Sequence, residues 1–127
     1  MYATRITFEK IDRNISNVSK SICKIKIGKS LRTIYGTGFL LRFHIEQESF
    51  YCLISNEHVI SKEIINNKNK IFIKYDNEYK SATIQLDSNI RYIKIFIDIN
   101  LDITIIEIIE EDNICKDYFY ILNQRKK

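Results

Sequence analysis

One histidine and one aspartate stand in sequence surroundings that suit chemistry. His58 follows the apolar run at residues 51–54, and Asp102 directly precedes the apolar run at residues 103–106. Such runs are typical of buried strands, so we expect both side chains at strand ends, where a cleft can form. An imidazole can take a proton from a hydroxyl, and a carboxylate can hold that imidazole in one tautomer. His58 and Asp102 are therefore candidates for a general base and its orienting acid.

A glycine-containing segment upstream adds a third part to this pattern. The three segments are Gly36-Thr37-Gly38-Phe39-Leu40-Leu41, Ser55-Asn56-Glu57-His58-Val59-Ile60 and Leu101-Asp102-Ile103-Thr104-Ile105-Ile106. In this order they resemble the first half of a trypsin-like (chymotrypsin-fold) serine protease, over residues 21–109. The resemblance implies that His58 is the general base and acid and that Asp102 orients it, on the first of two β-barrels. It also implies a polypeptide substrate and no cofactor.

The nucleophile of that family has no counterpart in this sequence. The family's serine lies in a Gly-x-Ser-Gly turn whose backbone N–H groups also form the oxyanion hole. Here no glycine follows Gly38 and no serine follows Ser88. Cys115 lacks flanking glycines, and we expect it to be a buried thiol. With the second barrel absent, we expect a partial serine-type endopeptidase domain that is inactive alone. The alternative is a pseudoprotease barrel that binds a peptide or protein, for example along a sheet edge.

The hydrophobic pattern predicts an all-β fold. From residue 21 onwards, isoleucines and other apolar residues recur at every second position, as in half-buried strands. Residues 70–75 and 79–86 are expected to form a hairpin, residues 90–99 to continue its second strand after a bend, and residues 101–109 to form a central strand. Closure into a small antiparallel six-stranded β-barrel would remove the sheet edges. The resemblance implies the same barrel.

The chain is expected to form one domain with two extensions. Residues 1–20 are a polar lead-in with a short helix, residues 21–112 form the barrel, and residues 113–127 are a C-terminal tail. The helix is expected from an apolar stripe at three- and four-residue spacing. A lone barrel should expose the face that a second barrel would cover. It could bury that face by self-association, or by packing the aromatic residues 118–122 back on the body.

Two assignments have competitors in the sequence. Asp98 competes with Asp102 for the role of the orienting acid, although the aliphatic run follows Asp102 directly. Gly36 and Gly38 lie inside an expected strand, where glycine often marks a bulge or a close backbone approach. The bulge could line a substrate cleft, or the glycines could serve only the curvature of the barrel.

Composition sets the remaining expectations. The chain has 127 residues, a formal charge of +4, no proline and three cysteines without metal-ligand spacing, so we expect no metal site. Residues 1–20 do not read as a secretion signal and no run is long enough to span a membrane, which predicts a cytoplasmic protein without a membrane partner. A nucleic-acid surface could use four basic residues, but lysine alternating with isoleucine is the ordinary solvent face of a strand. Those residues are Lys24, Lys26, Lys29 and Arg32.

Overall fold

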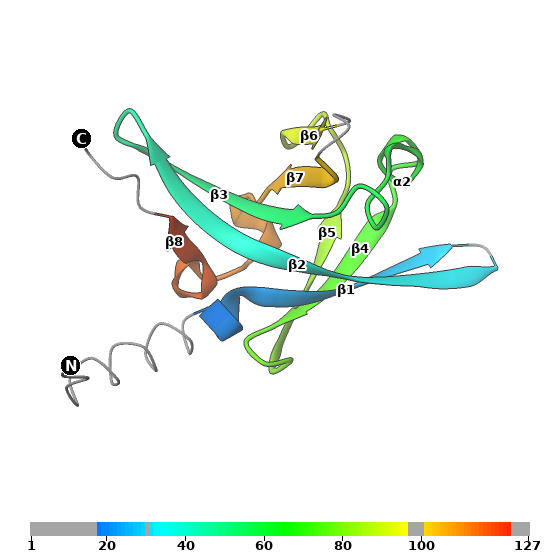
Figure 1. The fold of residues 1–127 in the computed structure, drawn as a ribbon, viewed down its shortest axis with the longest axis horizontal. Helices are drawn as coiled ribbons and strands as arrows, with labels where there is room; N and C mark the ends of the chain where they lie inside the picture. The colour runs from blue at the N-terminus through cyan, green and yellow to red at the C-terminus, as the bar shows by residue number, and fades with distance from the viewer. Residues whose placement is uncertain (1–17, 30, 97–100, 123–127) are drawn as a thin grey trace, which may run out of the picture.

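The computed structural model describes residues 18–29, 31–96 and 101–122, and they form a mostly antiparallel β-sheet (Figure 1). The all-β class predicted from the sequence is confirmed. The elements are β1 (Ile22–Lys29), β2 (Arg32–Ile45), β3 (Glu48–Ser55), α2 (Lys62–Asn66), β4 (Lys70–Tyr75), β5 (Lys80–Gln85), β6 (Ile93–Phe96), β7 (Ile103–Glu107), the 3-10 helices η1 (Glu110–Asp112) and η2 (Lys116–Tyr118), and β8 (Tyr120–Leu122).

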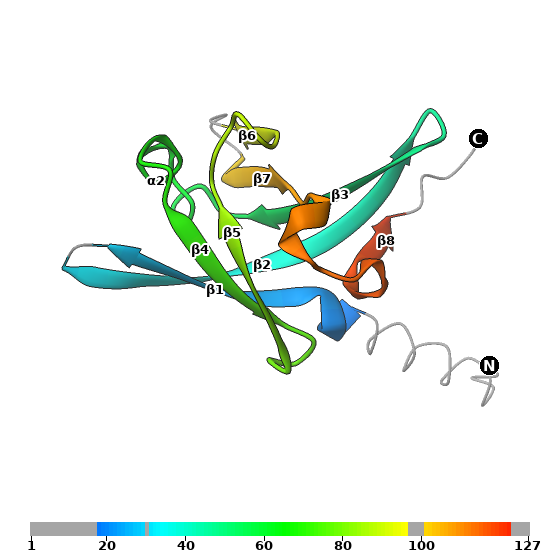
Figure 2. The same ribbon diagram turned by 180° about the vertical axis from the view of Figure 1, so that it is seen from behind.

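The strands form one curled sheet in the order β5-β4-β1-β2-β3-β7-β6. The short β8 lies outside this path and pairs in parallel with β2. Both ribbon views place β5 and β6, the two ends of the path, on the same side of the molecule (Figures 1 and 2). Among the described strands, however, no pairing joins β5 to β6. A closed six-stranded barrel is therefore not confirmed by the strand pairing.

The core lies on the inner face of the curled sheet. Cys23, Ile25 and Ile27 on β1 are buried, whereas the residues between them are exposed, and β4 shows the same alternation. This two-residue period is what a strand with one face in a core requires. The core also takes in Val59 and Ile60 of the turn after β3, Ile64 of α2, and Phe119 of the C-terminal segment.

Two hairpins turn without glycine or proline. Glu46 and Gln47 connect β2 to β3 with φ values of 49° and 72°, so the polar loop expected at residues 44–49 is a tight two-residue turn. Asp76, Asn77 and Glu78 connect β4 to β5 with φ values of 52°, 54° and 71°, where the sequence predicts the hairpin. Positive φ at two central residues matches the twist of hairpin strands, and Asn and Asp tolerate it best.

The two glycines of β2 provide space and do not form a bulge. The pairing of β2 with β1 and with β3 advances one residue at a time without a skip, so of the two alternatives drawn from the sequence the bulge is wrong and the close approach is confirmed. A Cβ at Gly36 would lie 2.4 Å from Val59 Cγ1, and one at Gly38 would lie 2.9 Å from the carbonyl oxygen of Ile54. Glycine is needed because the turn after β3 and the β3 backbone approach β2 so closely.

Other segments differ from the sequence prediction in detail. The expected connection at residues 60–69 contains α2, whose first turn is capped by the Ser61 hydroxyl accepting from Ile64 N (3.4 Å). Of the predicted strand at residues 90–99, β6 covers Ile93–Phe96 and pairs with β7, while residues 97–100 lie outside the described residues. Residues 18–21 are helical, and the rest of the predicted N-terminal helix lies outside the described residues, as do residues 123–127 of the predicted C-terminal tail.

A buried ion pair fastens the segment between β5 and β6 to the segment after β7. Arg91 donates Nη1 to Asp112 Oδ2 (2.6 Å) and Nη2 to Asp112 Oδ1 (2.8 Å), and Nη1 also donates to the carbonyl of Glu107 (3.0 Å). The two side chains are 2% and 4% exposed. Asp112 Oδ2 further accepts from Ile109 N (2.9 Å). This network fastens the connection that leaves β5 to the segment that follows β7, and no sequence pattern predicted it.

We expect Asp112→Ala to lower the free energy of unfolding by about 3–5 kcal/mol, because it leaves the buried Arg91 guanidinium without its counter-ion. The matched control is Glu78→Ala, which removes the exposed partner of Lys24 (3.0 Å) and should cost under about 1 kcal/mol. Urea denaturation of both variants measures the difference. Equal losses in the two variants would contradict the role given to the buried pair.

Candidate functional site: a histidine–aspartate pair

His58 lies in a tight turn that leaves the end of β3. Val59 N and Ile60 N both donate to the carbonyl of Asn56 (3.1 and 3.0 Å), which bends the chain sharply. The flanking residues Val59 and Ile60 are buried in the core, whereas the His58 side chain is 69% exposed. The apolar neighbours therefore fix the backbone of the turn and leave the imidazole facing outwards.

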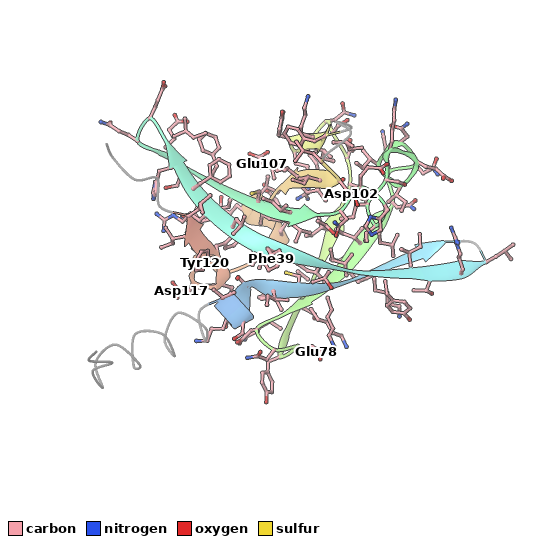
Figure 3. All side chains as sticks on the ribbon, viewed as in Figure 1. Phe39, Glu78, Asp102, Glu107, Asp117 and Tyr120 are labelled. Atoms are coloured by element: carbon pink, nitrogen blue, oxygen red, sulfur yellow. The ribbon has the colours of Figure 1, made fainter. Side chains whose placement is uncertain are left out.

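Asp102, labelled in Figure 3, stands one residue before β7 and contacts His58 of the turn after β3. Its Oδ1 accepts from the backbone N of His58 (3.1 Å), and its Oδ2 contacts Nδ1 of the imidazole. The Asp102 side chain is 46% exposed. The structure thus brings together the two residues that the sequence singled out, and the same carboxylate holds both the backbone and the ring of His58.

Further side chains that the sequence prediction did not assign attach the turn to its neighbours. Thr104 is fully buried and its hydroxyl donates to the carbonyl of Ile60 (2.9 Å). Asn56 Nδ2 donates to the carbonyl of Asp102 (3.4 Å), and the Ser55 hydroxyl donates to the carbonyl of Thr37 (2.8 Å). The sequence could have predicted a structural role for Thr104, because a hydroxyl within an apolar strand needs a hydrogen-bond partner when it is buried.

The electrostatics of the pair favour an ionised carboxylate. Desolvation acts to raise the pKa of Asp102, but the hydrogen bonds from the His58 ring and backbone outweigh it, and the pKa lies below its usual value. An ionised Asp102 favours the neutral tautomer of His58 that carries its proton on Nδ1. Neutral imidazole carries one ring proton, so Nε2 of His58 is left as a proton acceptor. The arrangement can act as a general base.

The described residues do not show a third member of a catalytic triad. The nearby hydroxyls of Ser55, Ser61 and Thr104 are each committed to backbone groups. Burial raises the pKa of Cys23 to about 12 and that of Cys52 to about 11, so neither is a ready thiolate. Cys115 is exposed, and the prediction that it is a buried thiol is wrong.

His44, the other histidine, has a different environment. It lies near the tip of the β2–β3 hairpin, where its Nδ1 is 3.0 Å from the hydroxyl of Ser49. That hydroxyl also accepts from Arg42 Nη2 (3.3 Å). A cation in place of a carboxylate distinguishes this histidine from His58, which makes His44 a natural internal reference.

The described residues contain neither a cluster of metal ligands nor a membrane-spanning helix. Across residues 18–29, 31–96 and 101–122, no three His, Cys, Asp or Glu side chains gather as a metal site would require. None of the helices in those ranges is both long and apolar enough to cross a membrane. Asp98, the competitor of Asp102, lies outside the described residues.

No protein-family model matches the sequence, and no curated protein matches it significantly.

We expect His58→Ala to raise the pKa of Asp102 towards its usual value, because the variant removes the ring donor that stabilises the carboxylate. His44→Ala should leave that pKa unchanged. Carboxyl ¹³C NMR titration measures both. Because the folded-state pKa of Asp102 is depressed, its contribution to stability is present at neutral pH and is lost as the pH falls through the folded-state pKa. An unchanged Asp102 pKa in His58→Ala would contradict the contact.

Proposed function

We propose that this chain carries the base and acid of a trypsin-like serine-type endopeptidase site. His58 acts as the general base and acid, and Asp102 orients it and stabilises its charged form. The nucleophilic serine, the oxyanion hole and the specificity pocket have to come from a second module, in a longer product or in a partner chain. The substrate of the completed site is a polypeptide.

The observation that carries the proposal is the double contact of Asp102 with His58. A carboxylate that merely opened a strand would not need to accept from both the backbone N and the ring Nδ1 of one histidine. Together the two contacts fix the position and the tautomer of the imidazole, which is the task of the acid in such a site. They also leave Nε2 directed away from Asp102, available to a hydroxyl.

The strand order supports the same proposal. The two ends of the path, β5 and β6, are consecutive in the sequence and are joined by residues 86–92. If they are regarded as one interrupted strand, the order returns to its starting point and has six positions: β5/β6, β4, β1, β2, β3 and β7. We infer that the curled sheet is a six-stranded barrel with an open seam between β5 and β6.

The second candidate function is peptide binding by an inactive barrel. Among the described strands, β5 pairs only with β4, and β6 pairs only with β7. A hollow of about 660 Å³ lies along β5 and is lined partly by Ser81, Thr83 and Glu111. An unpaired strand edge can accept an extended peptide through main-chain hydrogen bonds, and this mode would not involve His58.

The experiment that tests the proposed base is ¹⁵N NMR of the two imidazoles in the neutral state. We expect His58 to carry its proton on Nδ1, because the carboxylate of Asp102 accepts it there. His44 lacks a carboxylate and serves as the reference. Asp102→Asn should remove the preference at His58 without changing His44. A His58 ring protonated on Nε2 in the wild-type chain would overturn the proposed role.

We further expect the purified chain to show no peptidase turnover, since no described residue supplies the nucleophile beside His58. Casein and a panel of fluorogenic peptides are suitable substrates. Hydrolysis that is abolished in His58→Ala and retained in His44→Ala would show that the chain carries its own nucleophile and would refute the half-site. Binding of the same peptides without hydrolysis, unaffected by His58→Ala, would favour the peptide-binding alternative.

A further inference from the structure

The sheet has a second apolar surface on the side opposite the core. On β2 and β3, Leu40 and Leu53 are directly paired and point into the core. The residues that alternate with them point outwards, because successive side chains of a strand face opposite sides. The outward-facing pairs here are also apolar: Phe39 with Ile54, Leu41 with Cys52, and Phe43 with Phe50.

Neighbouring strands extend this surface at both sides. Ile22 of β1 is paired with Phe39, and Ile105 of β7 is paired with Ile54. Two residues of β8 are paired with Leu41 and Phe43. We call the whole set the outer apolar face; its members are Ile22, Phe39, Leu41, Phe43, Phe50, Cys52, Ile54, Ile105, Tyr120 and Leu122.

The outer apolar face is ordered, and five of its ten members are exposed. Phe43 and Phe50 stack with ring centroids 5.6 Å apart. Cys52 is only 3% exposed and yet is not part of the core cluster, so its neighbours on this face cover it. By contrast, Phe39 is 43% exposed and Leu122 is 51% exposed. Figure 3 marks Phe39 on β2 and Tyr120 on β8, two members of the face.

The charges at the margins of the face are of mixed sign. On the β1 side, Lys24 is paired with Glu78 (3.0 Å). On the other side, Lys94 of β6 and Glu107 of β7 share the outward direction of Ile105. Opposite charges therefore occur together at each margin. They present no block of like charge that would repel a surface of the same composition.

We propose that the outer apolar face is the interface of a symmetric dimer of this chain. Five of its ten members are 37–51% exposed, and contiguous exposed apolar patches of more than a few hundred Å² are rare on monomers. A standard interface buries roughly 800 Å² per partner, and the face with its polar margin would form the centre of such an interface. A two-fold axis lets the face pair with itself, and without a block of like charge nothing repels the second copy. The dimer is independent of the proposed His58 chemistry, which uses the turn after β3.

Sedimentation equilibrium of the full chain tests the dimer. We expect the wild-type chain to sediment as a dimer at micromolar concentration. Phe39→Asp should raise the dissociation constant about 100-fold, because two-fold symmetry buries the new charge twice. The matched control is Phe72→Asp, which changes the same residue type at a similar exposure (47%) on β4, outside the face, and should remain a dimer.

A second variant distinguishes loss of the dimer from loss of the fold. Leu122→Asp changes a residue that is 51% exposed at the end of β8. It should also give a monomer, with an unchanged circular dichroism spectrum. A wild-type chain that stays monomeric up to millimolar concentration would overturn the dimer and leave the face to a different protein. Dimers that persist in a folded Phe39→Asp or Leu122→Asp variant would overturn it equally.

Discussion

The β6–β7 end of the sheet is fastened by one buried ion pair. Arg91 and Asp112 join the segment before β6 to the segment after β7, beside the pairing of these two strands. The pair is costly to bury and is stabilised by its fork geometry and by added bonds to the carbonyl of Glu107 and to Ile109 N. It holds the segment that leaves β5 against the segment that leaves β7.

The position of the candidate site follows from this arrangement. β7 is held on one side by β3 and on the other by β6, which the Arg91 segment adjoins. Asp102 is thereby brought beside the turn that leaves β3, and Thr104 and Asn56 tie the two segments together. Gly36 contributes by leaving room for Val59, the neighbour of His58. A site on the surface is thus fixed by contacts that lie mostly beneath it.

The sequence predicted those parts of the fold that follow from local patterns. Period-two alternation located β1 and the β4–β5 hairpin, and the continuous apolar run located β7 in the interior of the sheet. The polar ends of two strands identified His58 and Asp102. The prediction failed where the reason was not local. The choice between a bulge and a close approach at Gly36 stayed open because Val59, which packs there, is distant in the sequence, and the Arg91–Asp112 pair carries no short-range signal.

The exposure of the pair defines what a completing module would have to supply. With His58 69% and Asp102 46% exposed, water screens their interaction and competes for Nε2. Preorganised hydrogen bonds stabilise a transition state best where water is excluded. A module that brought only a serine would leave the imidazole exposed to water. A module that also covered the turn and the start of β7 would supply the hydroxyl and exclude water from the His58–Asp102 pair. Docking and catalysis would then be coupled.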